Sequence, residues 1–195
     1  MNERQNHPKK GTKIKVEPIR EMKDIQTIKK LLADKPRDLC LFILGINTNL
    51  RASDLLSITA GQVRGMKPGD DLELKERKTC KLRRITLNKA CINAINALLA
   101  SWSYHDEDKL FQGQRGPITA SYLNRLVKGW AKALNLRGNY GSHTLRKTFG
   151  YIKHTVQGAS LPELMVCFNH STQRQTLDYL CIQEAAIRNI YMNEI

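Results

Sequence analysis

Long apolar segments, paired cysteines and nucleotide-binding loops are all missing from this sequence. No apolar run approaches the roughly 20 residues that span a bilayer, and the N-terminal stretch has no apolar signal core. The five cysteines are odd in number and none lie at CxxC spacing, so neither a disulfide framework nor a zinc site is indicated. No Walker loop and no carboxylate cluster suited to Mg²⁺ is present. A reducing cytoplasm fits this pattern best.

Acidic residues are also scarce relative to basic ones. The chain has 32 Lys and Arg against 18 Asp and Glu, a formal net charge of +14. Such a surplus attracts polyanions and predicts salt-sensitive nucleic-acid binding, and with it association with the nucleoid. An anionic membrane surface fits less well, and a merely soluble basic protein is the alternative that charge alone leaves open.

What the chain does contain is mainly helical periodicity. Hydrophobic residues make up 41% of it, enough for a sizeable core. Two short strands at 72–76 and 82–87 flank a turn, so the predicted class is mainly α with a small antiparallel β-sheet. One predicted helix ends near Ser57 and is capped by Ser53 or Thr48. Apolar spacing and capping residues place the other helices at about 21–33, 37–46, 88–103, 119–135, 142–158, from 160 and from 183.

Several side chains and one segment are assigned to the core or to the surface. Cys40, Cys91 and Cys167 lie in apolar stretches and are predicted to be small core residues. Trp102 is predicted on the inward face of its helix. Residues 1–18 are polar and basic and carry two prolines, which predicts a flexible N-terminal arm.

Three places before the last helices carry residue types suited to phosphate chemistry. Arg51 stands in GINTNLRASDLL between two helices, and Lys78 stands at the tip of a basic hairpin in ERKTCK. His143 and Arg146, in SHTLRKTFG, are three residues apart and share a helix face. They lie in the first turn, where N–H groups and the helix dipole favour an anion.

The fourth place is FNHSTQRQTLDYL, where Tyr179 follows His170 by nine residues. Each of the four features is weak alone. An HxxR pair is usually a solvated helix face, a single histidine is usually structural, and a tyrosine in an amphipathic stretch is usually a core residue.

Together, and in this order, the four places resemble the tyrosine recombinase (phage integrase) family from about Ile19 to the C-terminus. The matching strings are TNLRASD, KTCK, HTLR and FNH, the last followed after nine residues by a tyrosine. Where the family usually has glycine this chain has Asn49, Cys80 and Asn169; asparagine tolerates left-handed backbone geometry, whereas Cys80 puts the placement of Lys78 in doubt. The resemblance implies the fold of the tyrosine recombinase catalytic domain and the catalytic residues Arg51, Lys78, His143, Arg146, His170 and Tyr179.

The resemblance also implies a role for each residue. Tyr179 attacks the phosphodiester and forms a 3′-phosphotyrosyl link, which conserves the bond energy without ATP, metal or another cofactor. Arg51 and Arg146 are suited to clamp the phosphate oxygens, because guanidinium groups are bidentate donors and stay charged. His143 accepts the tyrosine's proton or holds the phosphate.

Of the remaining two, Lys78 is the general acid for the leaving 5′-oxygen and His170 adds a donor. Other basic residues are expected to bind DNA: Lys75, Arg77, Lys81, Arg83, Arg84 and Lys147.

The implied activity is site-specific recombination of double-stranded DNA by a homotetramer, with accessory directionality proteins as further partners. Two alternatives stay open, a type IB topoisomerase-like relaxation activity and a non-catalytic DNA-binding protein on the same fold. Relatives usually carry a separate core-binding domain before the catalytic one, whereas about 18 residues precede Ile19 here. The chain is then either an excised catalytic domain, residues 19–195, or a minimal enzyme whose basic arm, residues 1–18, does part of that work.

Overall fold

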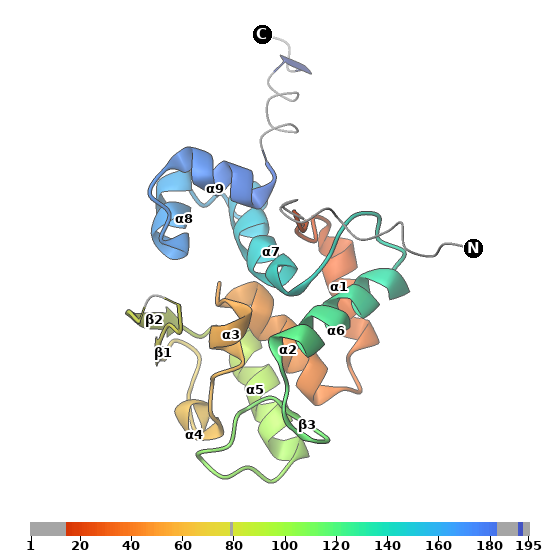
Figure 1. Ribbon diagram of the computed structural model, residues 1–195, viewed down its shortest axis with the longest axis vertical. Helices are drawn as coiled ribbons and strands as arrows, with labels where there is room; N and C mark the ends of the chain where they lie inside the picture. The colour runs from red at the N-terminus through yellow and green to blue at the C-terminus, as the bar shows by residue number, and fades with distance from the viewer. Residues whose placement is uncertain (1–14, 79, 183–190, 193–195) are drawn as a thin grey trace, which may run out of the picture.

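The computed structural model describes residues 15–78, 80–182 and 191–192. Helices make up most of this part of the chain, with small antiparallel pairs of strands (Figure 1). The predicted fold class is therefore confirmed. In chain order the elements are α1 (Met22–Leu31), α2 (Pro36–Asn47), α3 (Ala52–Leu55), α4 (Ala60–Val63), β1 (Asp71–Lys75), β2 (Leu82–Thr86), α5 (Lys89–Ser101), β3 (Gln112–Gly113), β4 (Gly116–Pro117), α6 (Ala120–Ala133), α7 (Ser142–Thr155), α8 (Leu161–Phe168) and α9 (Gln173–Leu180).

Capping side chains start several helices where the sequence predicts. Asn88 caps α5 and Thr119 caps α6, each by accepting a hydrogen bond from the backbone N–H three residues ahead. Ser160 opens α8 in a capping box with Glu163. The predicted helix that begins near residue 183 lies outside the described residues. Within the described part, no helix is both long and apolar enough to cross a lipid bilayer.

The start of α3 is not capped as predicted. Arg51 occupies the N-cap position without a side-chain hydrogen bond, and Ser53 lies inside the helix. The Thr48 hydroxyl donates instead to the carbonyl of Leu44, at 2.7 Å, because the last turn of α2 offers an acceptor four residues back. The start of α3 therefore presents an arginine rather than a capping hydroxyl.

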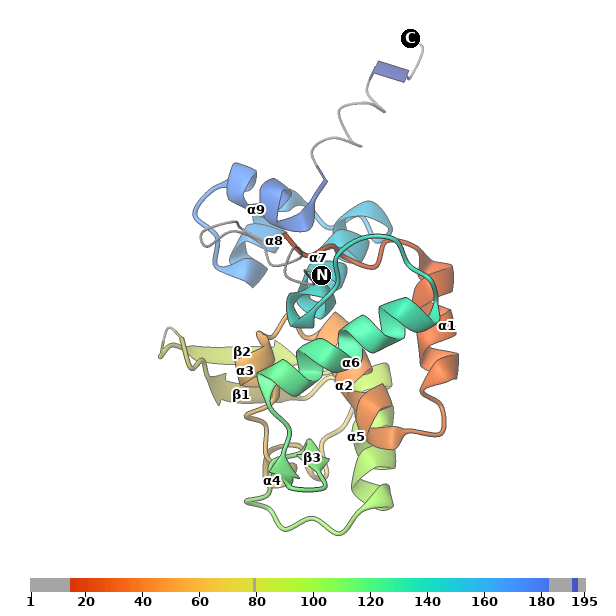
Figure 2. The same ribbon diagram turned by 45° about the vertical axis from the view of Figure 1, so that its right-hand side comes forward.

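The predicted hairpin is present as β1 and β2, which pair antiparallel with Lys75 opposite Leu82 at the end nearest the turn. Leu72 and Leu74 are buried while the residues between them are exposed, the alternation of a strand with one face on the core. A second, very short pair, β3 and β4, is not among the predicted elements. It joins α5 to α6 away from the first hairpin (Figure 2).

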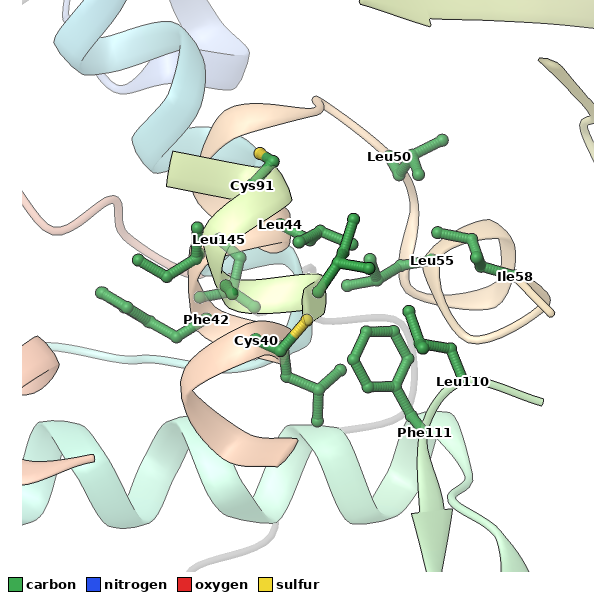
Figure 3. Packing of buried hydrophobic residues seen from close by; sticks show 14 of the residues in the cluster. Cys40, Phe42, Leu44, Leu50, Leu55, Ile58, Cys91, Leu110, Phe111 and Leu145 are labelled. Atoms are coloured by element: carbon green, nitrogen blue, oxygen red, sulfur yellow. The ribbon is translucent and has the colours of Figure 1, made fainter. Parts of the chain in front are cut away.

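The main core surrounds α2, whose buried side chains include Cys40, Phe42 and Leu44 (Figure 3). Helices α5 and α7 pack on either side of it. At Gly45 an added Cβ would lie 2.5 Å from the Leu145 side chain, so this glycine lets α2 and α7 approach closely. The helix is apolar nearly all round because it is covered on nearly all sides.

Two assignments to the core are wrong. Cys40 and Cys91 are buried as predicted, but Cys167 is exposed. Trp102 is 66% exposed, because α5 ends at Ser101 and the chain turns away in extended conformation at Trp102. Cys167 lies within α8 on the side that the main body does not cover, where Val166 is exposed as well.

A second, smaller core holds α8 and α9 together. We call residues 161–182 the cap; it lies at the end of α7 and on the same side of the molecule as the β1–β2 hairpin (Figures 1 and 2). An added Cβ at Gly150 of α7 would lie 2.6 Å from the side chains of Phe168 and Leu180, so the cap depends on a close approach to α7. The buried apolar residues of the cap are Leu164, Phe168, Leu180 and Ile182.

The end of the expected N-terminal arm lies against the domain. Pro18 is buried, and the N–H of Glu17 donates to the carbonyl of Asn139 at 2.8 Å. The N–H of Ile19 donates to the Thr148 hydroxyl of α7, also at 2.8 Å. Residues 15–18 are thus packed where the sequence predicts flexibility, and the rest of the arm lies outside the described residues.

Candidate active site

Arg51 is positioned by a left-handed turn between α2 and α3. Asn49 adopts φ +54°, which confirms that asparagine keeps a turn that glycine would favour. Leu50 is buried and anchors the turn, so the Arg51 side chain is held largely inside the site with 20% of it exposed. Below it, the fully buried carboxylate of Asp54 accepts a hydrogen bond from the backbone N–H of Arg77 at 2.9 Å. Asp54 therefore fixes the hairpin beside the arginine.

Glu76 also lies in the site, although the sequence interpretation did not assign it. It is 5% exposed, and its two carboxylate oxygens lie 2.7 Å from Arg51 Nη1 and 2.8 Å from Arg83 Nη1. A signal was present in the sequence, since Glu76 continues the inward alternation of Leu72 and Leu74. A carboxylate on that face needs a buried cation.

Arg146 is almost fully buried on α7 and joins the main body to the cap. It donates to the backbone carbonyls of Asn49 and, at 3.3 Å, of Phe168. Its guanidinium also lies over the Phe168 ring, 4.9 Å from the centroid. Burial lowers the pKa of Arg146 to about 10, which leaves it charged at neutral pH. The structure therefore provides a permanent, rigidly oriented positive charge.

His143 lies in the first turn of α7, one turn before Arg146, and is exposed. Partial removal from water lowers its pKa, and the nearby charges of Arg146, Lys147 and Arg51 lower it further. The imidazole is therefore predominantly neutral at pH 7 and can accept a proton. His143 and Arg146 both lie on α7, three residues apart, as the sequence predicts, but His143 is exposed whereas Arg146 is buried.

Tyr179 reaches the same place from α9. Its ring lies 5.2 Å from that of Phe168 and 5.3 Å from that of His170, measured between centroids. The hydroxyl oxygen is buried and forms no well-aligned hydrogen bond within the described part of the chain. Burial raises the pKa of Tyr179, while the charges of Arg146 and Arg51 oppose that rise. Arg146 is nevertheless close enough to act as a hydrogen-bond donor to the Tyr179 oxygen, so the hydroxyl is buried beside a cation.

His170 follows the end of α8. Asn169 adopts φ +55° there, so the second predicted left-handed asparagine is also confirmed. The imidazole stacks on Phe168 with centroids 5.2 Å apart, and its Nδ1 lies 3.1 Å from the Thr176 hydroxyl. Removal from solvent is the main cause that lowers the pKa of His170, and the charges of Arg146 and Arg51 lower it further. The ring is thus held edge-on to Tyr179.

Lys78 is exposed at the tip of the β1–β2 hairpin, and it is near enough to His143 to lower that residue's pKa. Cys80 adopts φ +56°, the left-handed conformation that glycine would favour at this place. The cysteine therefore keeps the turn, which removes the structural objection to Lys78.

The other basic hairpin residues divide into two groups. Lys75, Arg77 and Lys81 are exposed and stand on the hairpin beside the site. Arg84 is also exposed, but its Nε donates to Glu73 at 2.9 Å. Arg83 points inward to Glu76 and also donates to the carbonyl of Cys167 at 2.9 Å.

Lys147 does not lie where an exposed phosphate-binding residue would. It is 5% exposed, and its Nζ lies 4.9 Å from the centroid of the Tyr179 ring and 3.5 Å from the Cys181 sulfur. Burial lowers its pKa. Lys147 and Arg83 are thus internal cations that support the site, a distinction that charge counts along the sequence do not make.

Comparison with known proteins adds the family and the fold. The phage integrase family model matches residues 19–185. Probable integrase/recombinase YoeC of Bacillus subtilis (strain 168) is 36% identical over 180 residues, which cover 90% of this chain and 95% of that protein. The crystal structure of XerA recombinase superposes with a TM-score of 0.72 at 17% identity, over 95% of this chain and 65% of that one.

A second solved structure, XerH site-specific recombinase bound to palindromic difH substrate in a post-cleavage complex, gives a TM-score of 0.70 at 18% identity. The match covers 87% of this chain and 49% of that one. These likenesses at low identity concern the fold, and the chain spans between about half and two thirds of the two solved structures.

Proposed function

Because the chain belongs to the phage integrase family, we propose that it is a site-specific DNA recombinase that cleaves and rejoins strands through a 3′-phosphotyrosyl bond to Tyr179. The observation that carries this proposal is the buried hydroxyl of Tyr179, for which Arg146 and Arg51 are the charges that favour the ionised form. A nucleophile placed beside two guanidinium groups faces the position where a phosphate's charge is stabilised.

In this mechanism Arg51 and Arg146 bind the non-bridging oxygens of the scissile phosphate. Arg146 is fixed by the carbonyls of Asn49 and Phe168, so it needs little reorganisation when the phosphate arrives. Arg51 is less constrained, since its buried Nη1 lies beside a carboxylate without forming a well-aligned hydrogen bond. The two arginines together offset the charge that develops on phosphorus oxygens in the transition state.

Two proton transfers accompany the exchange of bonds. As the Tyr179 oxygen forms its bond to phosphorus, neutral His143 accepts the phenol proton. As the bond from phosphorus to the 5′-oxygen breaks, Lys78 donates a proton to that oxygen. In ligation the free 5′-hydroxyl attacks the phosphotyrosyl phosphorus and returns its proton to Lys78, while His143 returns a proton to the departing Tyr179 oxygen. The phosphodiester and the free tyrosine are thereby regenerated. His170 supports the Tyr179 ring and adds a polar group beside the phosphate.

We propose that the reaction needs neither metal nor ATP. The charges around Tyr179 are supplied by Arg51, Arg146 and Lys147. Among the described residues, no group of three or more His, Cys, Asp or Glu side chains is placed to hold a metal ion. Cleavage that survives excess EDTA supports this proposal, and loss of cleavage that Mg²⁺ restores contradicts it.

The proposed substrate is double-stranded DNA, with recombination carried out by a homotetramer on DNA and by accessory directionality proteins. The exposed cations of the hairpin, Lys75, Arg77 and Lys81, lie beside the site and are suited to contact flanking phosphates. We do not extend this role to Arg83 and Lys147, which are engaged inside the protein. In the XerH complex, a related fold is bound to its difH substrate.

The test is to trap a covalent adduct on nicked suicide duplexes tiled across the DNA that flanks the gene. The wild-type protein is expected to form a protein–DNA adduct, and Tyr179→Phe is expected to form none while binding the duplex about equally. Tyr191→Phe is the matched control, because Tyr191 is 85% exposed and stands outside the site. An adduct with Tyr179→Phe contradicts the assignment. Relaxation of supercoiled plasmid without partner sites would favour the topoisomerase-like alternative.

A further inference from the structure

Glu76 is an anion buried at the centre of a strongly cationic site. It ends the strand that leads to the Lys78 turn, and it carries its charge with only 5% of its surface exposed. Glutamate is almost never this buried without cationic partners, which here are Arg51 and Arg83. Its charge also favours the protonated form of Arg146. The Glu76 carboxylate thus interacts with three arginines of the site.

Asp54, the other buried carboxylate described in the site, has a different main partner. Asp54 is engaged by the backbone N–H of Arg77 at 2.9 Å, and its nearest approach to Arg51 is 3.8 Å. Glu76 lies closer, 2.7 Å from Arg51 Nη1, and is the dominant counter-charge of that guanidinium. Asp54 therefore holds the hairpin, whereas Glu76 holds the arginine.

The contact between Glu76 and Arg51 is suited to exchange. Arg51 Nη1 lies 2.7 Å from a carboxylate oxygen of Glu76, yet this nitrogen makes no well-aligned hydrogen bond within the described residues. The pair is a close ion pair, and a guanidinium carries five N–H donors, so Arg51 has donors for another oxyanion as well. A phosphate that enters the site competes with Glu76 for Arg51 and is repelled by the carboxylate at the same time.

The far side of Glu76 is anchored. Arg83 binds its second oxygen at 2.8 Å and also donates to the carbonyl of Cys167, two residues before Asn169. The amide of Asn49 donates to that same carbonyl at 2.6 Å. Glu76, directly after β1, is therefore tied to the cap through Arg83, independently of its contact with Arg51. It sets the direction from which Arg51 approaches.

We propose that Glu76 is a positioning residue that orients Arg51 toward the scissile phosphate and thereby lowers DNA affinity while raising the rate of cleavage. This inference rests on the proposed function. It differs from a purely structural role, in which loss of Glu76 weakens binding, cleavage and folding together.

The experiment compares Glu76→Gln with the wild type in two assays. Affinity is measured with a fluorescent mixed-sequence duplex at low salt, and cleavage is measured as single-turnover adduct formation on the nicked duplex identified above. Glu76→Gln is expected to bind about three- to tenfold more tightly, because a repelling charge is removed. It is expected to form adduct about tenfold to a hundredfold more slowly, because Arg51 is no longer oriented.

Two further variants separate charge from shape. Glu76→Asp keeps the charge on a shorter side chain, so affinity should stay near wild type while the rate is partly lost. Glu73→Gln makes the same change of net charge on the exposed face of the same strand, and it should leave the rate of adduct formation unchanged. Thermal melting of all three variants reports folding.

Opposite movement of affinity and rate in Glu76→Gln, with a melting temperature near wild type, supports the proposal. Unchanged values overturn it, and so does a parallel fall in affinity, rate and melting temperature, which would make Glu76 a structural tie only. Failure of the wild-type protein to form any adduct would instead remove the proposed function itself. If the wild-type protein forms an adduct but affinity and rate do not change in opposite directions in Glu76→Gln, only the proposed role of Glu76 is overturned.

Discussion

The two halves of the candidate site rest on supports of very different size. Arg51 and Arg146 stand on elements that pack into the main core around α2. His170 and Tyr179 stand on the cap, whose own core is limited to a few side chains of α8 and α9. Local stability follows the number of buried apolar contacts. The half with Arg51 and Arg146, which we propose binds the phosphate, is therefore expected to be the more rigid part. Tyr179, the proposed nucleophile, stands on the part that is expected to open more easily.

Arg146 is a direct link between the halves, because it donates to a carbonyl of the body and to a carbonyl of the cap. Arg146→Lys keeps the charge but loses the forked geometry that reaches both Asn49 and Phe168. We expect adduct formation to fall about 10²–10³-fold and stability to fall by about 1–3 kcal/mol. Adduct assays and urea melts measure the two effects.

Arg125→Lys is the control, since Arg125 is exposed on α6 and lies over Tyr122 away from the site. It should leave both quantities near wild type. A full rate in Arg146→Lys would show that the cap needs no such link.

Lys78 is carried by neither the main core nor the core of the cap, because it lies at the exposed tip of the β1–β2 hairpin. Lys78→Ala is expected to slow cleavage about 10²-fold or more through loss of the general acid. A substrate with a 5′-bridging sulfur, which leaves without a proton, should restore the rate. Lys89→Ala, an exposed lysine at the start of α5, should behave as wild type on both substrates. Lack of rescue by sulfur would leave Lys78 an electrostatic role only.

A pair of glycine variants compares the two cores directly. Gly150→Ala pushes a methyl group against Phe168 and Leu180, and Gly45→Ala pushes one against Leu145. Each overpacking is expected to cost about 1–3 kcal/mol. Gly150→Ala should raise hydrogen exchange mainly in α8 and α9 and slow adduct formation, with a small change in melting temperature. Gly45→Ala should lower the melting temperature of the whole domain. Identical exchange patterns in both variants would mean that the cap and body unfold as one unit.

The smallest expected effect concerns pH. The pKa of His143 is lowered from 6.5 by partial burial and by its cationic neighbours, so the neutral base persists below pH 6.5 and cleavage should decline only under more acidic conditions. Stability contributed by the neutral ring is present above pH 6.5 and is lost as pH falls toward the lowered pKa. Lys147→Met removes one neighbouring charge, so it should shift the acid limb of the rate profile to higher pH. If the acid limb of the rate profile does not move in Lys147→Met, the titration of His143 is not its cause.

Much of the fold follows from short-range signals in the sequence. The caps at Asn88, Thr119 and Ser160 act within three residues, so they are readable from the chain alone. The apolar period of α2 predicts its burial. The left-handed turns at Asn49 and Asn169 follow from the conformational range of asparagine.

Other features depend on which distant residues meet. The exposure of Cys167 and Trp102 could not be predicted, because it depends on whether another element covers that side of a helix. The same holds for Lys147, which the sequence places among surface cations and the fold places under the Tyr179 ring.

The sequence by itself determined the residue types of the site, their order and the local turns that present them, because these depend on backbone geometry over a few residues. Only the tertiary structure decided that Glu76 pairs with Arg51, that Arg146 joins the body to the cap, and that Tyr179, the proposed nucleophile, rests on the smaller core. Those relations require segments far apart in the chain to share one low-dielectric space, where each buried charge must find a partner.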